Sequence, residues 1–114
     1  MRVASKLAAL SAGAALAVAL PAAGAAAKPP AGKTYTITLR DMGYGAAPAT
    51  MHVGDAILWV NADIFVHTAT AKDGSFDLEL KPKAQAKTVF SKPGQIAFFC
   101  RYHPGMTGRL TIVR

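Results

Sequence analysis

"QIAFFCRYHPGM", residues 95–106, joins a short apolar run to a thiol, an imidazole and a thioether. The apolar run follows a Pro-Gly turn and predicts a buried strand that ends at Cys100. Cys100 is the only cysteine in the chain, and a lone buried cysteine is usually an inert core residue. The neighbouring His103 and Met106 therefore decide whether this thiol has a chemical role.

Outward from this stretch, the chain consists of short runs rich in β-branched and aromatic residues, separated by Gly, Pro, Asn and Asp. Seven runs of this kind are residues 34–39, 49–53, 56–61, 65–70, 86–90, 95–100 and 109–113. The runs at 56–60 and 96–99 are apolar on both faces, which predicts central strands. Tyr35, Ile37 and Leu39 alternate with threonines and predict a half-buried strand. We expect an all-β Greek-key β-sandwich of about seven to eight strands.

The first residues have the composition of a secretory signal peptide. Arg2 and Lys6 precede an apolar stretch at 7–20, and small residues follow it. We expect a signal peptide at 1–27 and export to the periplasm. An uncleaved membrane anchor is the alternative, but the apolar stretch is shorter than the roughly 20 residues that span a bilayer.

The rest of the chain is expected to be a short tether at 28–33 and one domain at 34–114. A domain of this size usually benefits from a disulfide or a metal ion. With one cysteine no internal disulfide can form, and an exported free thiol is exposed to oxidation unless it is shielded or ligated. The composition therefore favours a bound metal.

The charge is basic but dispersed. The formal net charge of +7 falls to +5 without Arg2 and Lys6. The lysines at 72, 81, 83, 87 and 92 are scattered, without the aromatic and basic array of a nucleic-acid site. The positive charge is either a solvated surface or an attraction for an acidic redox partner.

A fourth candidate ligand comes from a distant run, where His67 is flanked by apolar residues. Two imidazoles, a thiolate and a thioether, from His67, His103, Cys100 and Met106, form the ligand set of a blue copper site. Zinc is the weaker alternative because it seldom binds methionine. Taken singly, each of these residues is more often part of a core; their combination predicts one copper ion.

Four motifs, "MHVGDAILWVNAD", "HTATAKDGSFD", "KPGQIAFFCRYHPGM" and "TGRLTIV", cover most of the chain after residue 33. In these motifs the sequence resembles the cupredoxins, and among them the amicyanin/plastocyanin-like group. The Cys-x-x-His-x-x-Met spacing is similar to the short amicyanin-type loop. The resemblance implies that His67, Cys100 and His103 are strong copper ligands, that Met106 is a weak one, and that the protein is a periplasmic one-electron carrier.

The sequence departs from this group beside both histidines. Val66 stands where a proline commonly precedes the first ligand, and Tyr102 stands where a proline usually adjoins the second. With Phe65, Pro104 and Gly105 these two residues are expected to form an apolar docking patch around an exposed His103 edge.

Three functions were compared on these grounds. An electron carrier, with a redox protein as donor and another as acceptor, fits all four ligands. A copper enzyme needs a further histidine-rich copper site, and the remaining histidine, His52, is expected to face solvent on a strand; we therefore expect no enzyme. Copper delivery or storage remains the alternative. We expect a monomer without a membrane span after signal cleavage, and Trp59 as a core residue.

Overall fold

The computed structural model describes residues 32–114. The expected signal peptide at 1–27 and residues 28–31 of the expected tether lie outside the described residues. The described chain forms nine strands: β1 (Thr34–Arg40), β2 (Gly43–Tyr44), β3 (Met51–His52), β4 (Ala56–Asn61), β5 (His67–Ala71), β6 (Asp77–Leu80), β7 (Gln85–Val89), β8 (Gly94–Cys100) and β9 (His103–Val113). Within residues 32–114 no helix is long and apolar enough to cross a membrane.

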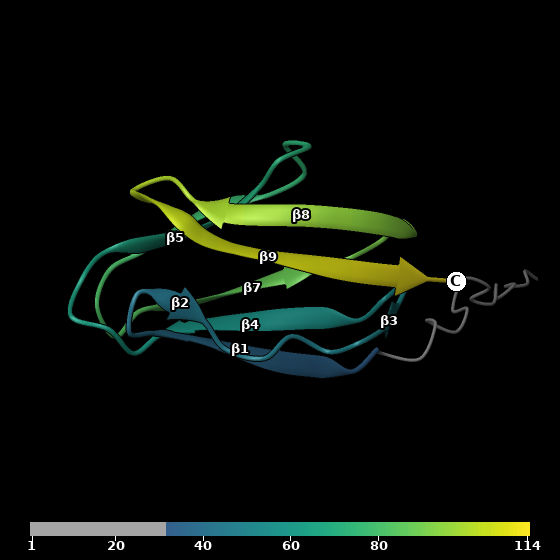
Figure 1. The fold of residues 1–114 in the computed structure, drawn as a ribbon. Helices are drawn as coiled ribbons and strands as arrows, with labels where there is room; N and C mark the ends of the chain where they lie inside the picture. The colour runs from purple at the N-terminus through teal and green to yellow at the C-terminus, as the bar shows by residue number, and fades with distance from the viewer. Residues whose placement is uncertain (1–31) are drawn as a thin grey trace, which may run out of the picture. The chain divides into compact units, whose positions relative to one another are not determined.

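The strands form two sheets that face each other across the core (Figure 1). One sheet has the order β2-β1-β4-β7, and the other has the order β3-β9-β8-β5-β6. The chain passes from one sheet to the other five times, after β2, β3, β4, β6 and β7. The expected all-β sandwich is confirmed.

The doubly apolar runs occupy the inner positions that their composition predicted. β4 lies between β1 and β7, and β8 lies between β9 and β5. The expected alternation in β1 is also confirmed, since Ile37 and Leu39 are fully buried. In both strands the residues between the buried ones, such as Leu58 and Phe99, are half-buried, so apolar side chains suit both faces.

Two strands, β2 and β6, were not predicted from the sequence. β2 is a two-residue bridge, Leu39 to Tyr44 and Arg40 to Gly43, too short to show a period. β6 has the sequence Asp-Leu-Glu-Leu, and its two charged residues are typical of a loop. It is a strand because it pairs with β5 at the edge of the sheet. Charged residues are common on such edges because they discourage pairing with other chains.

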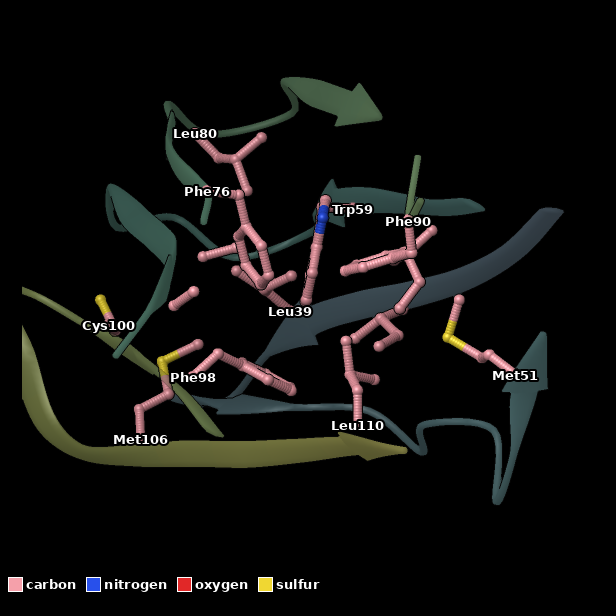
Figure 2. Close-up of a cluster of buried hydrophobic side chains, with 14 of the residues drawn as sticks. Leu39, Met51, Trp59, Phe76, Leu80, Phe90, Phe98, Cys100, Met106 and Leu110 are labelled. Atoms are coloured by element: carbon pink, nitrogen blue, oxygen red, sulfur yellow. The ribbon is translucent and has the colours of Figure 1, made fainter. Parts of the chain in front are cut away.

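Aromatic rings fill the centre of the sandwich (Figure 2). Trp59 is fully buried, with its ring centroid 5.2 Å from that of Phe98 and 5.7 Å from that of Phe76. Its indole N–H donates to the hydroxyl of Thr88 at 3.1 Å, so this buried donor is satisfied. The expectation that Trp59 is a core residue is confirmed.

The last strand begins earlier than the sequence suggested. The last strand was expected at residues 109–113, but β9 begins at His103, and Gly108 lies within it, opposite Phe98. A Cβ at Gly108 would lie 2.2 Å from the Phe98 ring, so only glycine fits at this crossing. The register shifts after Phe99, where Cys100 pairs with His103, and the three residues after His103 form an irregular bulge.

Candidate metal centre

Three strand ends meet at one end of the sandwich. His67 is the first residue of β5, Cys100 is the last of β8, and His103 is the first of β9. β8 pairs with both neighbours, so the ends of adjacent strands bring together side chains that are 36 residues apart in the sequence. The predicted convergence of these three residues is observed.

The ligand atoms have the spacing that one metal ion requires. The Nδ1 atoms of His67 and His103 are 3.2 Å apart, and the Cys100 Sγ is 3.9 Å from the first and 3.5 Å from the second. A point equidistant from these three atoms lies about 2.1 Å from each, close to the ~2.0–2.3 Å bonds of imidazole and thiolate to a divalent ion such as zinc. The donor set therefore fits a trigonal metal site.

The ring of His67 is held in one orientation. Its Nε2 lies 2.9 Å from Oδ2 of Asp63, while its Nδ1 faces His103. Metal-binding histidines commonly donate their second ring N–H to a carboxylate, which fixes the tautomer and leaves the other nitrogen free to bind. Asp63 is the carboxylate that faces Nε2 of His67.

Asp63 is itself fixed by the backbone. The N–H of Met42 donates to its Oδ2 at 3.1 Å, and the N–H of Ile64 donates to its Oδ1 at 2.8 Å. The hydrogen bond from His67, together with these backbone donors, lowers the pKa of Asp63 from 3.8 to about 2. The carboxylate is therefore ionised at neutral pH.

The thiol of Cys100 is fully buried but polarised. Burial raises the pKa of Cys100, while hydrogen bonds that the sulfur makes with the Thr68 N–H, the His67 ring, the Tyr102 N–H and the His103 ring lower it to about 6. The Thr68 nitrogen lies 3.3 Å from Sγ. The thiolate is the metal-binding form of cysteine, so this environment prepares the sulfur for a metal.

Thr68 also anchors the segment that carries the second histidine. Its hydroxyl accepts the N–H of Arg101 at 2.9 Å and contacts the hydroxyl of Thr70 at 2.8 Å. Thr70 donates to Asp77, which pairs with the Arg101 guanidinium at 3.1 Å. Arg101, the residue directly after Cys100, is thus tied to β5 by its backbone and to Asp77 of β6 by its side chain.

The remaining predicted residues are close to this centre. Met106 is 3 % exposed and belongs to the buried cluster that contains Cys100. Figure 2 shows both sulfur-bearing side chains at the same end of that cluster. His103 is half-buried, unlike the fully buried His67, and its ring lies 6.3 Å from that of Phe65.

His52 does not belong to the centre. It is exposed and pairs with Val113 at the far end of β9, whereas Cys100 pairs with His103 at the near end. Ten residues of strand separate the two ends, roughly 30 Å at about 3.3 Å per residue. Its expected exposure is confirmed.

The sequence analysis missed two residues of the site, Asp63 and Thr68. Asp63 precedes His67 by four residues in an irregular loop, and no helical or strand period predicts that the two side chains meet. Thr68 acts partly through its backbone N–H, which every non-proline residue carries. The adjacency of Thr68 to His67 was the one signal available.

A cupredoxin-like domain family matches residues 9–112 of the chain. The chain belongs to the cupredoxin-like family. It is similar to a protein named amicyanin from Paracoccus versutus, with 30 % identity over 94 residues that span 77 % of this chain and 70 % of the relative. Cupredoxins are copper-binding electron-transfer proteins, and a thiolate with two imidazoles is the donor set that such a site requires.

Solved structures agree on the fold. An oxidised amicyanin variant has a TM-score of 0.60 at 21 % identity and covers 69 % of this chain and 81 % of its own. A purple cupredoxin from Nitrosopumilus maritimus has a TM-score of 0.56 at 18 % identity and covers 68 % of this chain and 98 % of its own. The similarity to these two structures supports the assignment of the fold as a β-sandwich.

Proposed function

We propose that this cupredoxin carries single electrons between two redox proteins in the periplasm. One copper ion would supply the chemistry by alternating between Cu(I) and Cu(II). His67, Cys100 and His103 would hold it as strong ligands, and Met106 would hold it as a weak one. The observation that carries the proposal is the triangle of three ligand atoms around one common point.

The fold suits electron transfer because it keeps the ligands in place. His67 and Cys100 lie in paired strands with fully buried side chains. The Thr68 hydroxyl holds the backbone between Cys100 and His103. A rigid set of ligands limits the rearrangement that accompanies a change of charge, which lowers the barrier to electron exchange.

Electron exchange is proposed to pass through the half-buried edge of His103. Phe65 and Tyr102 are each 48 % exposed. The Phe65 ring lies near the His103 ring, and Tyr102 is the residue directly before His103. Exposed apolar side chains of this kind mark surfaces where partners dock and exclude water. Val66, Pro104 and Gly105 complete the proposed patch, which a redox partner would cover.

We propose that the protein has no enzymatic activity of its own. One ion would use all three grouped ligands, and His52 lies at the opposite end of β9. Among residues 32–114, His67, Cys100 and His103 form the metal-ligand cluster found in the structure. Periplasmic location is proposed from the likeness to amicyanin and from the signal peptide expected at 1–27.

The first test is the visible spectrum of the purified protein with Cu(II). We expect an intense blue thiolate-to-copper band, because the buried Cys100 sulfur is polarised toward the thiolate. Cys100→Ser should lose this band completely, since the chain has no other cysteine. Ser91→Ala, at an exposed site, is the control. An intense blue band in Cys100→Ser would contradict the proposal that Cys100 binds the copper ion.

Retention of the metal separates electron transfer from copper delivery. A carrier keeps its copper through repeated cycles of reduction and oxidation, whereas a delivery protein gives Cu(I) to an acceptor. We expect the blue absorbance to return fully after ten or more cycles in the presence of a Cu(I) chelator. Stepwise loss of colour to the chelator would favour delivery or storage.

A further inference from the structure

The Asp63 carboxylate and the His67 ring form a hydrogen-bonded pair directly behind the proposed copper site. The carboxylate oxygen lies 2.9 Å from Nε2, the side chain of His67 is fully buried, and that of Asp63 is 11 % exposed. The contact with Asp63 is made by Nε2, the His67 ring nitrogen that points away from Cys100 and His103. A charge held so close to a ligand, with little water around it, is weakly screened.

The backbone near Asp63 is arranged to hold the carboxylate there. The turn between β1 and β2 places Asp41 and Met42 at φ 53° and 62°, in the left-handed region that non-glycine residues rarely adopt. This turn directs the Met42 N–H to Asp63. Backbone strain of this kind persists where the surrounding contacts require it.

The loop around Asp63 has a second, independent anchor. Asn61 donates from its side-chain amide to the carbonyl oxygens of Phe65 and Leu80, both at 2.8 Å. Its side-chain oxygen accepts the backbone N–H of Asp63 at 2.9 Å. None of these three bonds uses the Asp63 carboxylate, so removing its charge should leave the loop in place.

We propose that Asp63 is a positioning residue of the copper site, an inference that rests on the proposed function. Through Nε2 of His67 it fixes the tautomer that presents Nδ1 to the metal. Its negative charge also increases the electron donation of the imidazole, which favours Cu(II) over Cu(I). Asp63 therefore strengthens Cu(II) binding and lowers the reduction potential.

The charge is tested by Asp63→Asn, which has the same shape and can still accept the Nε2 hydrogen. Partners of metal-binding histidines typically contribute 10–100-fold to metal affinity. We expect Cu(II) to bind at least tenfold more weakly while Cu(I) affinity changes little. A tenfold change confined to one oxidation state raises a one-electron potential by about 59 mV.

Asp41→Asn is the matched control, because it removes the same charge from an exposed residue of the neighbouring turn. Asparagine also tolerates the positive φ at this position. A long-range charge effect would shift the potential equally in both variants. The proposal requires the shift in Asp63→Asn to exceed that of Asp41→Asn clearly, and equal shifts would overturn it.

The tautomer is tested without copper and without any variant. Nitrogen-15 NMR of the metal-free native protein should show His67 with its proton on Nε2. A proton on Nδ1 would overturn the positioning role. Because this readout needs no metal, the result stands even if the blue band is absent, in which case the proposed function fails separately.

Discussion

At the scale of single residues, Cys100 shows how its surroundings polarise a side chain that is usually inert in a core. Burial alone favours the neutral thiol, but four hydrogen-bonding groups reverse the balance and lower its pKa to about 6. Two of them are backbone N–H groups, from Thr68 and Tyr102. The sulfur is therefore prepared by the fold as much as by the neighbouring histidines.

Met106→Gln tests the axial position. An amide oxygen is a harder ligand than a thioether and favours Cu(II), so we expect a copper site with a lower potential. A tenfold change in relative affinity corresponds to about 59 mV, and we expect at least this decrease by voltammetry. Val89→Gln, at an exposed residue of β7 away from the site, should leave the potential unchanged. A native potential in Met106→Gln would remove Met106 from the site.

Tyr102→Pro tests the backbone N–H that contributes to the low pKa of Cys100. Proline lacks this donor, so the sulfur should donate more charge to copper and stabilise Cu(II). Hydrogen bonds to charged groups contribute ~1.5–3 kcal/mol. If about 1 kcal/mol of this differs between oxidation states, the potential falls by roughly 40 mV.

The control for this variant is Tyr102→Phe, which keeps the N–H but loses the hydroxyl that donates to Glu79. Voltammetry of both variants separates the two contributions. A potential in Tyr102→Pro equal to or above that of Tyr102→Phe would show that this N–H does not affect the sulfur.

At the scale of elements, Asp55 joins four segments at the end of the sandwich opposite the metal site. Its carboxylate accepts the backbone N–H groups of Lys33 and His52, each at 2.8 Å. Its own backbone accepts the N–H of Phe90. These hydrogen bonds connect the residue before β1, the end of β3, the residue before β4 and the residue after β7.

Asp55→Asn should destabilise the fold, because an amide replaces one of two acceptor oxygens with a donor. The hydrogen bonds from His52 and Lys33 hold the pKa of Asp55 below 3.8 in the folded state. A lowered folded pKa contributes stability above the unfolded pKa, and this is lost as the pH falls through the folded pKa.

The measurement is urea unfolding of metal-free protein at pH 7 and at successive values below pH 4. The native protein should be more stable than Asp55→Asn at pH 7, and the difference should shrink in the acid range. Asp41→Asn, at an exposed carboxylate, should follow the native curve. A difference that is constant with pH would mean that the Asp55 charge does not contribute.

At the scale of the whole molecule, exposed apolar side chains are found beside the metal centre. Ile64 is 79 % exposed, and Phe65 and Tyr102 are each 48 % exposed. Phe65 packs near the His103 ring, at 6.3 Å between centroids. In the proposed electron route through His103, two identical molecules that exchange electrons would bring these surfaces together.

Phe65→Lys should slow electron self-exchange, because two like charges would then meet at the contact. Electrostatic effects on association range from about 10- to 1,000-fold, and we expect at least a tenfold decrease at low salt with an unchanged visible spectrum. Val89→Lys is the matched control, since Val89 is 62 % exposed on β7 and pairs with Ala56, the end of β4 away from the site. Equal rates in both variants would place the contact elsewhere.

The sequence by itself determined the fold class and the ligand cluster. The alternation in β1 and the doubly apolar runs of β4 and β8 are local patterns, and strand periodicity reports them directly. Cys100 and His103 are three residues apart, so a short turn brings them together whatever the rest of the chain does. The thiol, imidazole and thioether also have few common roles in combination, which made the copper site predictable.

Only the tertiary structure decided how the site is supported. Asp63, Thr68 and the short strands β2 and β6 acquire their roles from partners far along the chain, such as Met42 for Asp63 and Cys100 for Thr68. A hydrogen bond between distant segments leaves no periodic signal, because any polar residue or backbone N–H can make it. The candidate ligands could therefore be predicted from the sequence alone. The charges and hydrogen bonds around them depend on how the two sheets pack.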